Sequence, residues 1–189
     1  MGVAAVSGGE HIEASAESAE KERRQTAGGE ASLRITTALE AVSLLLEDPA
    51  HITEQPIWPG ASSTRRQARP ITRLQAAVWL RAEARSRVGY EIQRARGAGA
   101  SWQEIAVVLG LVDADRATPY DQAVAAFEEA MADGFSLHHF GFTCATCGAS
   151  VRDYGPFEPH PIDREEGHAE GCARMAAQLA EWKAKHGDD

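Results

Sequence analysis

The sequence has few cysteines, few aromatic residues and no long apolar run. Its three cysteines cannot all pair within the chain, which argues against the disulfide framework of a small secreted protein. No apolar stretch approaches the roughly 20 residues that a membrane-spanning helix requires. The N-terminal residues also lack the basic start and apolar core of a secretory signal. We therefore expect a cytoplasmic protein without a membrane partner.

Aromatic residues make up only 6% of the chain, whereas alanine is abundant. Alanine and leucine enter helices at little cost, while strands prefer branched and aromatic residues. The composition therefore predicts a mainly α fold. The helical pattern is clearest over residues 71–134, as a long helix from about Ile71 to Arg96, a short helix ending at Gly110, and a third helix from Pro119 to about Ala132.

The other segments differ in composition. Residues 1–30 are rich in Gly, Ser, Ala and Glu, so we expect a disordered acidic arm. Residues 31–48 carry apolar side chains at helical spacing and predict an amphipathic helix. Prolines and small polar residues mark residues 49–70 as a linker. Residues 140–186 form a last module, whose C-terminal helix we expect to begin near Glu166.

Charge is distributed unevenly along the chain, which has a net charge of −9. Residues 65–96 hold nine arginines against two glutamates. Acidic residues outnumber basic ones ten to four in residues 1–64 and sixteen to six in residues 97–189. The middle of the chain is therefore a basic block between two acidic flanks.

All three cysteines lie within one short window near the C-terminus. Cys144 and Cys147 are separated by two residues and followed by a glycine, while His168 and Cys172 have i, i+4 spacing. On a helix, that spacing places both side chains on one face. Three thiolates and one imidazole would complete a tetrahedral site, so we predict a structural Zn²⁺ in a small treble-clef or zinc-ribbon-like module. His160 is the competing imidazole, and three unrelated thiols or a redox pair are the alternatives.

The stretch ARGAGASWQEIAVVLGL, residues 95–111, has the pattern of a long helix, a small-residue turn and a short capped helix. It resembles the first two helices of helix-turn-helix domains, especially those of the sigma-factor region 4 type. With the CxxC…HxxxC end, the layout is similar to a group of actinobacterial helix-turn-helix proteins that carry a zinc finger. The resemblance implies a helix-turn-helix-like bundle that binds double-stranded DNA and regulates transcription. The segment after the turn departs from the pattern, because its helix contains four acidic residues and no Lys or Arg.

If DNA is bound, the positive charge must come from outside that acidic helix. The nucleic-acid-binding candidates are Arg81, Arg85, Arg87, Arg94, Arg96, Gln103 and Arg116. Homodimerisation would suit such a role. The alternative is a protein-interaction adaptor, in which the acidic helix and the zinc module dock a protein partner. Glycine, serine and histidine patterns typical of catalytic sites are missing, so we expect a protein that is not an enzyme.

Overall fold

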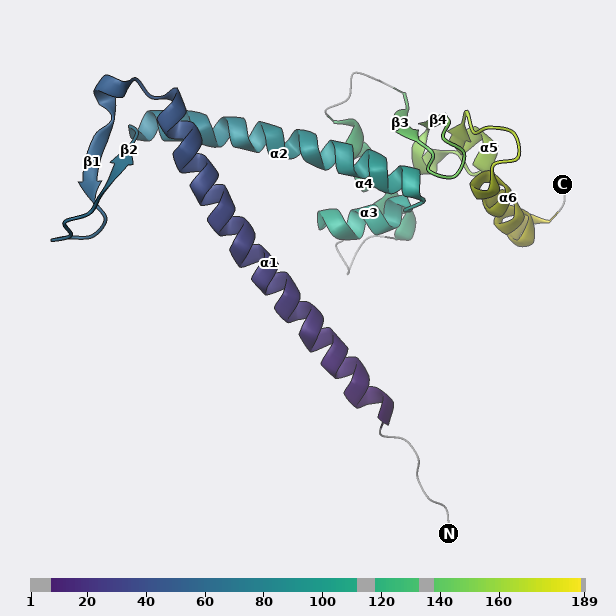
Figure 1. Ribbon diagram of the computed structural model, residues 1–189. Helices are drawn as coiled ribbons and strands as arrows, with labels where there is room; N and C mark the ends of the chain where they lie inside the picture. The colour runs from purple at the N-terminus through teal and green to yellow at the C-terminus, as the bar shows by residue number, and fades with distance from the viewer. Residues whose placement is uncertain (1–7, 112–117, 133–137, 188–189) are drawn as a thin grey trace, which may run out of the picture. The chain divides into compact units, whose positions relative to one another are not determined.

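The computed structural model describes residues 8–111, 118–132 and 138–187 (Figure 1). The chain divides into two compact units, Met1–Glu83 and Ala84–Asp189. The prediction of a mainly α fold is confirmed, because six α-helices and two small sheets make up the described part of the chain. The long helix α2, Pro70–Ala98, contributes its first half to the first unit and its second half to the second.

The first unit contains α1, Gly8–Leu46, and an antiparallel hairpin of β1, Thr53–Pro56, and β2, Thr64–Gln67. A short 3₁₀ helix, η1, at Pro49–His51, lies between α1 and the hairpin. The structure differs here from two expectations. Residues 8–30 are helical where we expected a disordered arm, and the segment expected to be a linker contains the hairpin. Residues 1–7 lie outside the described part of the chain.

The helical conformation of residues 18–37 does not depend on burial, because nearly all of their side chains are exposed. Ion pairs one turn apart support it instead: Arg24 lies 2.9 Å from Glu20, and Arg34 lies 2.8 Å from Glu30. Alanine and glutamate are also strong helix formers. The low apolar content that indicated disorder is therefore compatible with an exposed helix.

The second unit begins with the end of α2 and continues into α3, Trp102–Leu109, and α4, Pro119–Met131. The predicted capping box is present, because the Ser101 hydroxyl accepts from the Glu104 amide and the Glu104 carboxylate accepts from the Ser101 amide. Gly110 ends α3 in the left-handed conformation, with φ of 69°. Trp102 packs edge-on against Phe127 of α4, with ring centroids 5.2 Å apart. The predicted third helix and its starting proline are also confirmed.

The C-terminal part of this unit is a three-stranded antiparallel sheet in the order β3-β4-β5, followed by a helix. The strands are β3, Phe140–Thr143, β4, Ser150–Asp153, and β5, Glu165–Glu166, with η2, Gly155–Phe157, α5, Pro161–Arg164, and α6, Ala173–His186. The last helix therefore begins later than the expected Glu166. Phe142 and Val151 of the sheet belong to the same buried cluster as Trp102 and Ile105 of α3. Helices and sheet thus share one core.

In the part of the chain described, no helix combines the length and the apolar character that crossing a membrane would require.

Candidate metal centre

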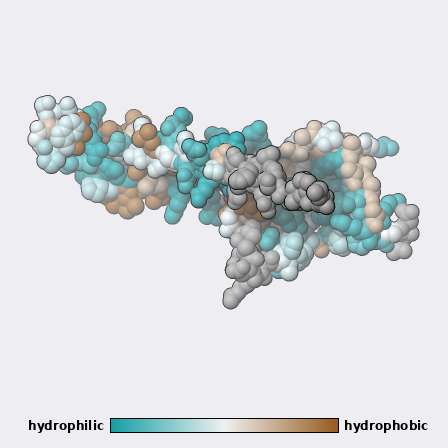
Figure 2. Space-filling view, turned by 90° about the horizontal axis from the view of Figure 1, so that it is seen from below, coloured by the Kyte–Doolittle hydropathy of each residue, from teal (hydrophilic) through white to brown (hydrophobic). Residues whose placement is uncertain are grey.

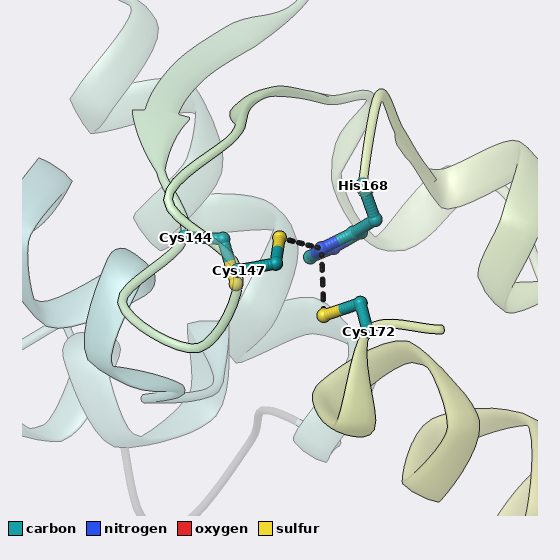
Figure 3. A group of neighbouring side chains, drawn as sticks. All are labelled: Cys144, Cys147, His168 and Cys172. Atoms are coloured by element: carbon teal, nitrogen blue, oxygen red, sulfur yellow. Dashed lines mark hydrogen bonds between the residues drawn. The ribbon is translucent and has the colours of Figure 1, made fainter. Parts of the chain in front are cut away.

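Four side chains converge beside the sheet: Cys144, Cys147, His168 and Cys172 (Figure 3). Their potential ligand atoms all lie within 4.8 Å of one another. The His168 Nδ1 atom is 3.7 Å from the sulfur of Cys147 and 3.4 Å from that of Cys172. The structure therefore brings together the four predicted ligands in an arrangement that could hold a metal ion.

The turn between β3 and β4 supplies the first two cysteines. The Gly148 amide donates to the Cys144 carbonyl at 2.8 Å, and the Cys144 amide donates to the Ala149 carbonyl at 2.9 Å. Gly148 has φ of 71°, in the left-handed region that favours glycine. Within this turn the amides of Thr146 and Cys147 bond the sulfur of Cys144, and the amide of Ala149 bonds the sulfur of Cys147.

Backbone amides favour the thiolate form of both cysteines in the turn. Amides of Ala169 and Ala149 lower the pKa of the Cys147 thiol to about 7. Burial raises the pKa of the Cys144 thiol, but amides of Cys147 and Thr146 outweigh that effect and hold the pKa below its ordinary value. Metal ions bind the deprotonated form of cysteine, so the lowered pKa values of these two thiols favour binding of a cation.

His168 and Cys172 reach the site by a route different from the one we expected. They do not share a helix: His168 lies in the loop after β5, and Cys172 is the N-terminal cap of α6. Gly167, with φ of 104°, turns the chain just before the histidine. The Met175 amide lowers the pKa of Cys172, but burial and the other two thiols raise it above its ordinary value. A cation bound at the site would favour the thiolate form of Cys172 and so oppose the effect of burial and of the neighbouring thiols.

The competing histidine, His160, is not part of the cluster. Its ring packs edge-on against Trp182 with centroids 4.6 Å apart, and its Nδ1 atom accepts from the Ile162 amide at 3.3 Å. The choice of His168 over His160 is therefore supported by geometry.

A buried carboxylate lies behind the histidine, on the side away from the sulfur atoms. The His168 Nε2 atom is 3.0 Å from Glu165 Oε2. Burial raises the pKa of Glu165, but the positive charge of Arg96, the bond to His168 and the contact with Arg174 lower it below its ordinary value. Glu165 remains ionised and accepts a hydrogen bond from Nε2–H of His168, so that Nδ1 is the ring nitrogen that faces the site. The sequence analysis did not identify Glu165, although its position three residues before His168 could have indicated it.

Arg96, which we listed as a candidate for DNA binding, lies in the interior of the second unit. Its side chain is 5% exposed and makes ion pairs with Asp153 and Glu165. The guanidinium also lies over the ring of Trp102, 5.0 Å from its centroid. Because these contacts hold it inside, Arg96 does not face solvent and is corrected to a structural residue. In the sequence, Arg96 resembled a solvent-exposed side chain because it lies among other arginines. Its acidic partners could not be seen locally, since they lie 57 and 69 residues further along the chain.

Five of the other nucleic-acid candidates are exposed side chains. Four of them are exposed on α2, namely Arg81, Arg85, Arg87 and Arg94, and Gln103 is exposed on α3. Arg94 makes an ion pair with Glu91 at 3.2 Å. Arg116 lies outside the described residues.

An apolar groove of about 600 Å³ lies between α2 and α3. Its lining is Arg87, Val88, Glu91, Ile92, Ala95, Ala100, Glu104, Ile105, Val108 and Leu109. Val108 is 86% exposed, so the α3 wall of the groove presents an apolar side chain to solvent. On the face that Figure 2 shows, patches of apolar residues lie among hydrophilic ones.

Comparisons with protein-family models, with curated proteins and with solved structures find no match to this chain.

Proposed function

We propose that the metal centre holds a structural Zn²⁺ and that the second unit is a non-catalytic adaptor, which binds a helix of a protein partner. Three sulfurs and one imidazole are the donors that Zn²⁺ prefers in structural sites. Four protein ligands leave no open position for a substrate or water. The ion would therefore fix the loop that carries His168 against the turn that carries Cys144 and Cys147.

Metal content tests the first part of this proposal. Purified protein should contain about one equivalent of zinc per chain, since one four-ligand site binds one ion. His168→Ala should lose the ion, whereas His160→Ala should retain it. These two histidines lie in the same segment, so the pair of variants separates ligation from a general effect of removing a histidine. Retention of zinc by His168→Ala would contradict the ligand set.

The apolar groove between α2 and α3 is the observation that carries the adaptor role. Monomeric proteins seldom leave such a surface uncovered, and grooves between helices accept amphipathic helices of partners. The second unit contains ten basic and seventeen acidic residues. Among the residues that line the groove, Glu91 and Glu104 stand against the single base Arg87. Charge complementarity therefore favours a basic amphipathic helix as the occupant.

A designed peptide tests the groove without knowledge of the natural partner. The probe is a helical peptide of leucine and lysine with one apolar face, and its control has the same composition without that face. Fluorescence anisotropy should show binding of the first peptide and much weaker binding of the second. Val108→Lys should weaken binding at least about tenfold, by introducing a like charge into an apolar contact. Val107→Lys is the matched control, because Val107 is 63% exposed on the same helix but does not line the groove.

Equal binding of the two peptides, or equal effects of the two valine substitutions, would contradict the adaptor role.

DNA binding is the second candidate, and the exposed arginines along α2 are the observation that favours it. Guanidinium groups suit phosphate oxygens. The acidic surface of α4 counts against it, because a helix without positive charge repels the DNA backbone. A gel shift with random duplex at low salt should detect a complex that dissociates steeply as salt increases. The double substitution Arg85→Glu and Arg94→Glu should abolish it, and a chain that ignores duplex at low salt does not bind DNA.

A further inference from the structure

A continuous series of polar contacts leads from a metal ligand to the first residue of α3. His168 contacts Glu165 at 3.0 Å, and Glu165 accepts from the Arg96 guanidinium at 2.6 Å. The Nε atom of Arg96 donates to Asp153 Oδ2 at 2.9 Å. The same carboxylate oxygen accepts from the indole Nε1 of Trp102 at 3.1 Å. We call His168, Glu165, Arg96, Asp153 and Trp102 the relay.

The relay lies inside the second unit. Glu165, Arg96, Asp153 and Trp102 are all buried. Water cannot readily replace a lost partner at such a place, so each charged group depends strongly on the position of the next. Removal of one partner from a buried pair leaves an uncompensated charge. A displacement at one end of the relay is therefore costly unless the other end also moves.

Aromatic contacts hold the middle of the relay in one geometry. The Arg96 guanidinium lies over Trp102 at 5.0 Å and over Phe142 at 5.5 Å from the ring centroids. The guanidinium of Arg174 covers Phe142 at 4.9 Å and donates to Glu165 at 2.9 Å. Arg96 thus has little freedom to find new partners if Glu165 changes position.

Trp102 connects the relay to the helical part of the unit. It is the first residue of α3, and its ring packs edge-on against Phe127 of α4 and Phe140 of β3, each at 5.2 Å between centroids. A shift of the Trp102 indole would therefore shift the N-terminal end of α3. The same helix supplies Ile105, Val108 and Leu109 to the apolar groove.

We propose that Glu165 and Arg96 are positioning residues that join the metal centre to α3, so that metal binding and packing of Trp102 occur as one cooperative step. A bound ion holds the Nδ1 side of His168, and the Nε2 side then holds Glu165 in the position that Arg96 requires. Coupling of this kind is reciprocal: groups that position Trp102 also raise the affinity of the site for metal. The proposal depends on metal binding but not on any partner in the groove.

The indole N–H of Trp102 reports on the relay directly. In a full-length chain with Trp58→Phe, Trp79→Phe and Trp182→Phe, Trp102 is the sole tryptophan. Its indole resonance in a ¹H–¹⁵N spectrum should be sharp, and protected from exchange with solvent, when one equivalent of Zn²⁺ is bound. Removal of the ion with a chelator should shift or broaden the resonance and remove its protection. An unchanged resonance would overturn the proposal.

The reciprocal measurement is the affinity for Zn²⁺, determined by competition with a chromophoric chelator. Arg96→Gln should weaken zinc binding about 10- to 100-fold, the range found when groups behind a metal ligand are altered, although Arg96 contacts no ligand atom. Arg94→Gln, an exposed arginine on the same helix, is the matched control and should leave the affinity unchanged. Equal affinities of the two variants would also overturn the proposal.

A second core variant distinguishes the proposed coupling from a general loss of stability in Arg96→Gln. Met131→Ala removes a partly buried side chain of α4 that packs against the core and should lower the melting temperature, yet Met131 makes none of the contacts described for the relay. Its zinc affinity, measured below its unfolding transition, should stay within about twofold of wild type. An equal loss of affinity in Met131→Ala and Arg96→Gln would show that stability alone is responsible. The indole measurement requires no change in the relay, so it decides the question even if Arg96→Gln does not fold.

Discussion

The backbone of Gly97 lies directly against the backbone of Thr143, where the end of α2 meets the end of β3. A Cβ atom added to Gly97 would lie 2.3 Å from the Thr143 carbonyl oxygen. The Gly97 carbonyl accepts from the Ala145 amide at 2.9 Å, within the turn that supplies Cys144 and Cys147. The absence of a side chain at Gly97 thus allows α2 to support the turn that carries both cysteines.

Gly97→Ala should lower the stability of the second unit, because the new methyl group would meet a backbone atom that cannot move aside. We expect a loss of about 1–3 kcal/mol in the free energy of unfolding. Urea denaturation followed by circular dichroism measures it. Gly89→Ala is the control: it lies on the same helix, a Cβ there meets nothing within 4 Å, and it should be neutral or stabilising by up to about 1 kcal/mol. Similar losses in both variants would contradict the close approach.

Glu165→Gln should weaken metal binding, because a neutral amide supports the His168 ring less well than a carboxylate does. The expected loss of zinc affinity is about 10- to 100-fold. Glu166→Gln is the matched control: Glu166 is exposed and its carboxylate accepts from the Tyr154 hydroxyl at 3.0 Å instead. Competition with a chelator measures both affinities. Undiminished affinity in Glu165→Gln would show that His168 is oriented by other contacts.

Much of the candidate metal site could be predicted from sequence, because the types of residue that bind metal and their spacing leave few choices. The reason offered for one pair was wrong, however. The spacing of His168 and Cys172 suits a helix, but glycines at 167 and 171, with φ of 104° and 72°, place the histidine in a loop. The ligands converge because the loop and the start of α6 face the turn after β3. Local spacing identified the residues, whereas their geometry depends on the fold.

The role of Arg96 could not be predicted from local pattern. It lies among eight other arginines in residues 65–96, and nothing in its neighbours distinguishes it from a solvated side chain. Its burial depends on Asp153 and Glu165, which come from β4 and β5. The helix over residues 8–30 was also not predicted. It is stabilised by helix propensity and local ion pairs, so the sequence contains no apolar stripe that would indicate a helix.

Asp153→Asn should destabilise the second unit more than most single substitutions. Asp153 is fully buried and accepts from Arg96, from the Trp102 indole and, through Oδ1, from the Gly155 amide at 2.8 Å. Loss of its charge leaves the buried Arg96 only partly compensated, so we expect a cost of about 3–5 kcal/mol. Thermal and urea unfolding measure it. Asp163→Asn serves as the control, since the Asp163 side chain is 69% exposed and should change stability by less than about 1 kcal/mol.

Glu47 makes the first unit sensitive to acid. It lies at the end of α1, and its carboxylate accepts from the Arg69 guanidinium and amide and from the Thr72 hydroxyl, each at 2.8 Å. The hydrogen bond with the Arg69 side chain is the largest influence, and together these contacts lower the pKa of Glu47 from 4.5 to about 2. They connect α1 with the residue before α2 and with the first turn of that helix.

The sign of the pH effect follows from the lowered pKa. Unfolded chains bind a proton at Glu47 near pH 4.5, whereas folded chains resist protonation until about pH 2. The contribution of Glu47 to stability is therefore complete above pH 4.5, and it decreases as the pH falls from there toward 2. The Arg69 amide, which donates to Glu47, should show this in ¹H–¹⁵N spectra as a titration with a midpoint near 2. Glu47→Gln should remove the titration, and a midpoint near 4.5 would show that the carboxylate does not hold these contacts in solution.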